Sequence, residues 1–170
     1  MKKSPSYYSL GDHAETIQID YDLDQITYHE LLDVFWKSHN PTSRALSRQY
    51  MSIIFYHDEE QKRVALETRD REAAKQNARL YTEIVPYTEF YLAEDYHQKY
   101  RLQHEPELMG EFRRMFPHMA DFVHSTAAAR VNGYLAGYGT AKAFEEEIDM
   151  LGLSEAGVRK LRQIVAARER

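Results

Sequence analysis

Hydrophobic positions follow two different periods along the chain, and the change falls near residue 105. From Thr16 to Tyr21 apolar and polar residues alternate, which predicts a half-buried strand. The nearly unbroken apolar run from Tyr50 to Tyr56 predicts a buried strand. A third strand is predicted from Thr82 to Tyr91, with an edge, a bulge or a break at Pro86, because proline lacks the N–H that a strand ladder uses.

Helical patterns lie between these strands. A capping-box pattern at residues 27–30 predicts the start of a helix that Pro41 terminates, since proline cannot continue it. Asp58 opens a second helix with a charged outer face, and Glu94 with Asp95 opens a short third one, because carboxylates favour the positive end of a helix. The first 105 residues therefore predict a mixture of strands and helices.

After residue 105 every apolar stretch has helical spacing. We expect one helix that stops at Pro117, a second that starts at Ser125 and ends near Asn132 or Gly137, a third, and a last one capped by Ser154. The apolar positions that define these helices are Leu108, Phe112, Met115, Phe116, Phe144, Ile148, Leu151, Val158, Leu161, Ile164 and Val165. This part of the chain is therefore predicted to be all helical.

Composition limits the classes of function. The chain has 170 residues, 43% of them hydrophobic and 29% charged, which suits a solvated surface around a real core. A net charge of -5 argues against nucleic acid as a partner, because phosphate binding needs clustered Lys and Arg. Met1-Lys2-Lys3 is not followed by an apolar segment, and no run has membrane-spanning length, so we expect no signal peptide, no membrane association and a cytoplasmic location.

Cysteine is absent from all 170 residues, which excludes disulfides, thiolate zinc sites and thiol nucleophiles within them. None of the eight histidines has the His-x-x-x-His spacing that places two imidazoles on one helical face. We therefore expect no metal site and no cofactor.

Two groups of polar residues are candidates for chemistry. Glu15 precedes the first predicted strand, where it is either a solvated carboxylate or a general acid held partly desolvated. On a helix, Tyr96 and Tyr100 would share one face, and Asp95 would reach Lys99. That pattern describes either an ordinary helical turn or a pocket floor in which a carboxylate and a tyrosine hydroxyl meet a neutral dipolar ligand.

Five blocks of sequence in order carry a resemblance to a known family. They are residues 11–22, 28–41, 47–52, 55–61 and 90–100. Over residues 5–103 the chain resembles the A-type peptide methionine sulfoxide reductases. The helical part that follows, including residues 125–139, looks like the C-terminal extension of one subgroup of that family.

The resemblance implies reduction of the S epimer of methionine sulfoxide, free or in an oxidised protein. In the family a cysteine thiolate attacks the substrate sulfur while the oxygen is protonated, a sulfenic acid forms on the cysteine, and a second thiol regenerates the enzyme. By this resemblance Glu15 is the catalytic acid, Asp95 and Tyr100 are substrate-binding residues, and Tyr7 is a second tyrosine donor.

The family's Gly-Cys-Phe-Trp-Gly motif, with the nucleophile, is missing from these residues. We expect the chain to start where the first third of a family member would end, which removes a strand-helix-strand unit and leaves sheet edges and an apolar face uncovered.

The expected fold is α+β: a two-layer sandwich from a βαβ-type, ferredoxin-like core with a mixed sheet, plus a helical extension. Residues 1–105 are expected to form the reductase-like domain and residues 106–170 the extension. The leading functional hypothesis is a reductase-family chain that is inactive alone. The alternative is a non-catalytic binding or assembly module that pairs with itself as a homodimer or with a partner chain. A third hypothesis is an unrelated enzyme that reuses Glu15, Asp95 and the tyrosines for acid–base chemistry.

Overall fold

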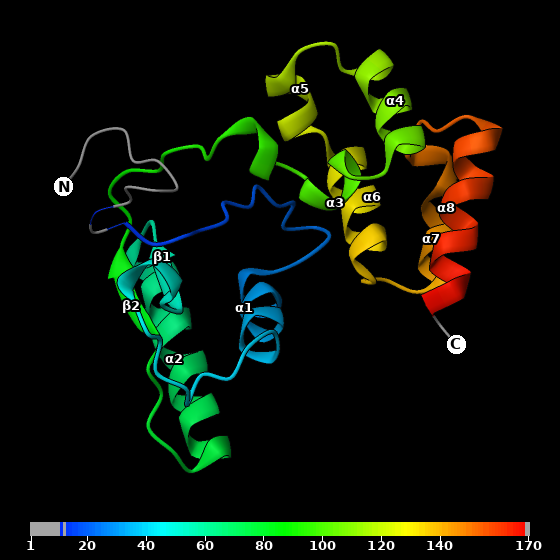
Figure 1. Cartoon of the computed structure of the whole chain (residues 1–170). Helices are drawn as coiled ribbons and strands as arrows, with labels where there is room; N and C mark the ends of the chain where they lie inside the picture. The colour runs from blue at the N-terminus through cyan, green and yellow to red at the C-terminus, as the bar shows by residue number, and fades with distance from the viewer. Residues whose placement is uncertain (1–10, 12, 169–170) are drawn as a thin grey trace. The chain divides into compact units, whose positions relative to one another are not determined.

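The computed structural model describes residue 11 and residues 13–168. They divide into two compact units, Met1–Leu92 and Ala93–Arg170, and each has a hydrophobic core of its own. Figure 1 labels the elements of both units. The architecture is mixed α/β and mostly helical, with a small parallel sheet in the first unit and helices alone in the second. The domain boundary that the sequence places near residue 105 stays a prediction.

The first unit is built on one βαβ crossover. Strand β1 (Ile53–Tyr56) leads into helix α2 (Glu59–Gln76), which returns the chain to strand β2 (Glu83–Pro86) beside β1 (Figure 1). The two strands are parallel, with Ile53 opposite Glu83 and Tyr56 opposite Pro86. A parallel pair needs such a crossover because no tight turn can bring the chain back in the same direction.

The sheet is smaller than the sequence predicts. Residues 16–21 join no ladder within the described part of the chain, so the strand expected there is not formed. The strand expected at residues 50–56 loses its first residues because Arg48–Tyr50 forms the short 3-10 helix η1. The third expected strand ends at Pro86, as proline's missing N–H predicts.

Helix α1 (Tyr28–Lys37) begins with the predicted capping box. The Thr27 hydroxyl accepts from the Glu30 N–H, and the Glu30 carboxylate accepts from the Thr27 N–H at 2.8 Å. The helix packs against α2, and the core of the unit is Leu32, Trp36, Ile54 and Ala65. The core is small because the sheet of this unit has two strands.

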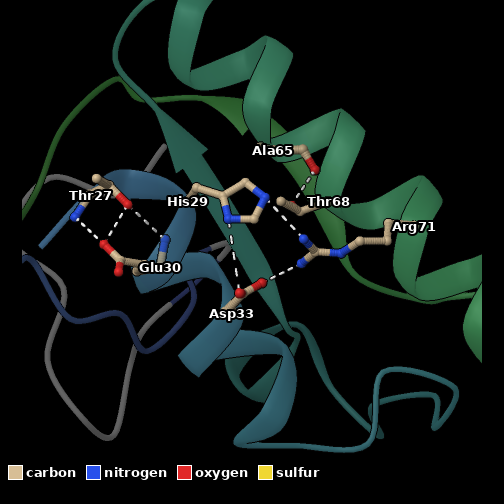
Figure 2. A network of polar contacts seen from close by, with 7 residues as sticks. All are labelled: Thr27, His29, Glu30, Asp33, Ala65, Thr68 and Arg71. Atoms are coloured by element: carbon tan, nitrogen blue, oxygen red, sulfur yellow. Dashed lines mark hydrogen bonds and ion pairs between the residues drawn. The ribbon is translucent and has the colours of Figure 1, made fainter.

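A polar cluster joins α1 to α2 on the outside of this core. Figure 2 shows Arg71 of α2 reaching both His29 and Asp33 of α1. Its guanidinium donates to His29 Nε2 at 2.9 Å and to the Asp33 carboxylate, and the second of these hydrogen bonds is the main reason that the pKa of Asp33 lies below its usual value. The cluster fixes the rotation of one helix against the other.

The second unit is helical throughout. Its elements are η2 (Asp95–His97), α3 (Tyr100–Gln103), α4 (Pro106–Met115), α5 (Met119–His124), α6 (Thr126–Ala136), α7 (Ala141–Glu147), η3 (Ile148–Met150) and α8 (Glu155–Arg168). Helix α6 lies at the centre, in contact with α3, α5 and α8. The core holds Leu102, Leu108, Phe112, Phe122, Val131, Phe144, Leu151 and Leu161, all at most 2% exposed.

The predicted starts and stops of these helices are largely confirmed. Ser125 caps α6 by accepting from the Ala128 N–H, and Gly137 ends it with φ 90°, a backbone conformation that glycine adopts without strain. Ser154 caps α8, with its hydroxyl accepting from the Gly157 N–H at 3.2 Å. Helix α5 was not predicted, because its six residues are too short to display a period. None of the helices in the described ranges is long and apolar enough to cross a membrane.

Candidate functional site

Glu15 is attached to the loop before β1 by two hydrogen bonds. Its backbone N–H donates to the Gln49 carbonyl at 2.9 Å, and the Gln49 side-chain amide donates to Glu15 Oε1 at 2.7 Å. The Glu15 side chain is exposed in this unit, so the partial desolvation considered from the sequence is not seen there. One carboxylate oxygen is thus fixed by Gln49, while Oε2 has no hydrogen bond within the described residues.

Two aromatic rings lie close to this segment. The His13 ring meets the edge of Tyr91 at 5.3 Å between centroids. The Tyr91 hydroxyl donates to Glu89 at 2.5 Å, which raises the pKa of Tyr91 because the hydrogen bond is made by the protonated form. Tyr91 therefore remains a hydrogen-bonded neutral phenol beside the chain that carries Glu15.

Asp95 and Tyr100 belong to the second unit and share one short segment. The sequence predicts one short helix here, with Tyr96 and Tyr100 on one face, and this is wrong: Lys99 has φ 48° and separates η2 from α3. Tyr96 and Tyr100 consequently do not share a helix face. Each ring packs on a histidine, Tyr96 on His97 at 4.2 Å and Tyr100 on His104 at 4.1 Å between centroids.

Side-chain amides hold this segment in addition to its short-range backbone hydrogen bonds. The Gln103 amide donates to the backbone carbonyls of Asp95 and Gln98, each at 2.6 Å, and the Gln98 amide donates to the Ala93 carbonyl at 3.0 Å. The side chains of Asp95 and Tyr100 are both exposed within their unit. Burial lowers the pKa of neighbouring Lys99, because desolvation disfavours the charged ammonium.

The structure describes three of the four predicted site residues, and these three are divided between the two units. Asp95 and Tyr100 lie on one segment of the second unit, and Glu15 lies in the first unit. Tyr7 is outside the described residues. Sequence reasoning missed the two glutamines, Gln49 and Gln103, that hold these segments, although Gln49 lies in one of the blocks that carry the family resemblance.

Other polar residues considered from the sequence have structural partners. The Asn132 side chain accepts from the Leu102 N–H at 3.2 Å, and Arg130 pairs with Glu147 at 3.2 Å. Among the described residues no group of three His, Asp or Glu side chains is placed to hold a metal ion. The chemistry that the candidate site residues offer is therefore proton donation and hydrogen bonding.

Two family descriptions match the chain. Residues 1–130 match peptide methionine sulfoxide reductase, and residues 120–166 match the helical domain of selenoprotein methionine sulfoxide reductase A. The first match spans Glu15, Asp95 and Tyr100, and the second spans helices α6 and α7 and all of α8 but its last two residues.

Individual relatives agree with this assignment. A peptide methionine sulfoxide reductase of Drosophila melanogaster is 43% identical over 155 residues, which cover 88% of this chain and 61% of the fly protein. One from Oryza sativa is 37% identical over 144 residues, covering 79% of this chain and 55% of the rice protein. One from Methanosarcina acetivorans is 46% identical over 95 residues, covering 52% and 50%.

The chain thus spans between 50% and 61% of the length of these relatives. The match to the fly protein, over 155 residues, includes most of the helical unit as well as the βαβ unit. With a family match over residues 1–130 and these identities, the chain belongs to the peptide methionine sulfoxide reductase family, and its C-terminal helices are those of the family's helical domain.

Proposed function

We propose that these residues supply the acid and the substrate-binding groups of a peptide-methionine (S)-S-oxide reductase, and that turnover needs a thiol from outside them. The observation that carries the proposal is the family match across Glu15, Asp95 and Tyr100 in a sequence without cysteine. The substrate is methionine sulfoxide, free or in an oxidised protein.

Each residue has a separate role in this proposal. Glu15 gives a proton to the sulfoxide oxygen, and Gln49 orients the carboxyl group that does so. Asp95 and Tyr100, with Tyr7, hydrogen-bond the substrate's polar groups. Sulfoxide oxygen is a poor leaving group, so a positioned acid and hydroxyl donors lower the barrier to breaking the S–O bond.

The external thiol performs the redox step. A thiolate attacks the sulfoxide sulfur, the S–O bond breaks, and the oxygen ends on the thiol as a sulfenic acid while the substrate becomes a thioether. A second thiol then condenses with the sulfenic acid, forming a disulfide and releasing water. Serine or aspartate cannot replace cysteine here, because only sulfur accepts the oxygen in this way.

A wider sheet belongs to the same proposal. The two-layer βαβ sandwich with a mixed sheet, which the sequence predicts, requires at least one antiparallel strand beside the parallel pair β1 and β2. Residues 16–21 have the alternation of such a strand but pair with no strand among the described residues, so they would need a further strand from outside those residues to join the sheet.

One observation favours the alternative of a binding or assembly module. Within the described residues the β1–β2 pair has no further strand on either outer edge, and Ile17 and Ile19 are 80% and 51% exposed. Open edges and exposed alternating apolar residues are features that a second chain covers in strand addition. Sedimentation of the purified chain separates the two ideas, since a module predicts a homodimer or a stable complex.

The test of the proposed function has two arms. The purified chain alone, given N-acetyl methionine (S)-sulfoxide and dithiothreitol, is expected to produce no thioether, because a small thiol in solution is not held against the substrate sulfur as a thiol of a folded segment is. The same chain fused behind a segment with the family's Gly-Cys-Phe-Trp motif is expected to reduce the S epimer and leave the R epimer unchanged.

Variants of the fusion assign the roles. Glu15→Gln should abolish most of the activity, whereas Glu59→Gln, which changes an exposed carboxylate at the start of α2, should leave it intact. Turnover by the unfused chain, or full activity of the Glu15→Gln fusion, would contradict the proposal.

A further inference from the structure

We propose that a pocket at the start of β1 and β2 in the first unit binds a doubly charged oxyanion of the phosphate type. The pocket has a volume of about 730 Å³, and residues 43–48, 51–52 and 79–83 line it. This volume exceeds that of one phosphate group and leaves room for a small organic group attached to it. The inference does not depend on the reductase chemistry proposed above.

Backbone hydrogen bonds hold the two walls of the pocket together. The Tyr81 N–H donates to the Pro41 carbonyl at 2.8 Å, and the Glu83 N–H donates to the Ser52 carbonyl at 3.0 Å. The 3-10 turn η1 closes with the Met51 N–H on the Arg48 carbonyl at 3.2 Å. These hydrogen bonds therefore fix the backbone positions of the arginines on the two walls relative to one another.

Three arginines and one carboxylate line this pocket. Arg48 Nη1 pairs with Glu83 at 2.6 Å, which leaves the remaining guanidinium donors of Arg48 available. Arg79 lies over the ring of Tyr81, 5.5 Å from its centroid, and makes no ion pair with the described residues. Arg44 makes neither a hydrogen bond nor an ion pair with the described part of the chain.

The net charge of the side chains that line the pocket indicates the class of ligand that it binds. Three guanidinium groups against one carboxylate leave two positive charges uncompensated, in a chain whose net charge is -5. A doubly charged phosphate group neutralises both, whereas a carboxylate neutralises one. The planar guanidinium also matches phosphate oxygens with two parallel hydrogen bonds.

Unused hydroxyl groups at the same place support this assignment. The hydroxyls of Ser43, Ser47 and Ser52 line the pocket and make no hydrogen bond within the described residues. Elsewhere the hydroxyls of Ser38 and Ser154 are engaged, the first with the Phe35 carbonyl and the second with Glu111. Phosphate oxygens are good acceptors for such free hydroxyl donors.

Isothermal titration of the full chain with inorganic phosphate, in a phosphate-free buffer at about pH 8 where the ion is doubly charged, tests the proposal. Saturable binding is expected, and it should weaken by about tenfold or more in Arg44→Gln and in Arg79→Gln, because each substitution removes a charge-assisted contact. Arg69→Gln is the matched control, since this partly exposed arginine of α2 pairs with its neighbour Asp70 and lies outside the pocket.

Further arms of the titration identify the source of the oxyanion. O-phosphoserine binding more tightly than inorganic phosphate assigns the pocket to phosphorylated side chains, and the reverse order assigns it to the free ion. Acetate at equal ionic strength should bind more weakly than either. Arg44 has no side-chain partner among the described residues, so its variant is expected to keep the fold, which circular dichroism checks. Absence of saturable binding, equal weakening in Arg69→Gln, or acetate binding as tight as phosphate would overturn the proposal.

Discussion

Gln49 holds Glu15 from both its main chain and its side chain. The Gln49 carbonyl accepts from the Glu15 N–H at 2.9 Å, and the Gln49 amide donates to Glu15 Oε1 at 2.7 Å. Two hydrogen bonds from one residue restrict the carboxyl group to a narrow range of orientations. The residue proposed as the acid is thus positioned by a residue 34 places away in the sequence.

Replacing Gln49 with alanine is expected to reduce activity in the cysteine-supplied fusion by about fivefold, because one hydrogen bond of about 1 kcal/mol orients the acid. The main-chain hydrogen bond survives this substitution, so the fold should not change. The measurement is kcat/KM for the S epimer, with Gln18→Ala, a change of an exposed amide, as control.

A double-mutant cycle separates positioning from a general loss of stability. If Gln49 acts through Glu15, then Gln49→Ala has little further effect once Glu15→Gln is present. Effects that simply add in the double variant would contradict the positioning role.

The helical half of the fold follows from local signals. Ser125, Gly137 and Ser154 act at helix ends within a few residues of the apolar positions they delimit, so their effect can be predicted from sequence alone. The sheet depends on distant partners instead. Residues 16–21 alternate as a strand does, yet a strand exists only where another backbone pairs with it, and none does so within the described residues.

The candidate site divides in the same way. The resemblance implied the roles of Glu15, Asp95 and Tyr100. It did not indicate which residues hold them in place. The positive φ of Lys99 breaks the predicted short helix. Neither residue spacing nor composition predicts a lysine in the left-handed backbone region. Gln49 and Gln103 carry no catalytic signal of their own, because their role depends on which carbonyl or carboxylate the fold brings to them.

Tyr28→Phe is expected to leave the first unit equally stable or to stabilise it by up to about 1 kcal/mol, because a buried hydroxyl without a partner is costly. The Tyr28 hydroxyl is buried and has no hydrogen-bond partner among the described residues. Chemical denaturation followed by Trp36 fluorescence measures the change. Tyr134→Phe is the matched contrast: its hydroxyl donates to Glu147 at 3.2 Å, so that variant should destabilise the second unit.

Tyr28→Phe should also change how the stability of the first unit falls at alkaline pH. Burial, with smaller effects from Tyr21 and Asp58, raises the pKa of Tyr28 from 10.0 to about 12. Because the folded pKa is the higher one, the contribution is complete below pH 10 and is lost as the pH rises to about 12. Tyr28→Phe should therefore flatten part of this decline, and an identical decline in both proteins would exclude Tyr28 as its cause.

Arg71→Gln is expected to destabilise the first unit by roughly 0.5 kcal/mol, since exposed ion pairs are screened by water. It removes the contacts of Arg71 with His29 and Asp33 (Figure 2). The pKa of Asp33 is lowered in the fold, so this contribution is present above the pKa of an unfolded aspartate and lost as the pH falls below it. Urea melts at neutral and acidic pH should show a difference from wild type only at neutral pH.

Gly157→Ala tests how α8 is attached to α4. Glu111 accepts from the Ser154 N–H at 2.7 Å and from its hydroxyl at 2.6 Å, which seats its carboxylate over the first turn of α8. A Cβ on Gly157 would lie 2.7 Å from Glu111 Oε1 and 2.9 Å from its Cδ, too close for either atom to stay. The methyl group therefore requires this carboxylate to shift, and we expect the shift to break its hydrogen bonds with Ser154.

Two opposed effects set the sign of this last change. Alanine in place of glycine favours a helix by about 1 kcal/mol. Losing the charge-assisted hydrogen bonds between Ser154 and Glu111 costs about 1.5–3 kcal/mol, so the variant should be less stable by about 1 kcal/mol. In a Glu111→Ala background no carboxylate remains to displace, and the same Gly157→Ala change should stabilise. Thermal melts of the four proteins measure the reversal, and a stabilising effect in both backgrounds would mean that the Glu111 carboxylate moves aside without cost.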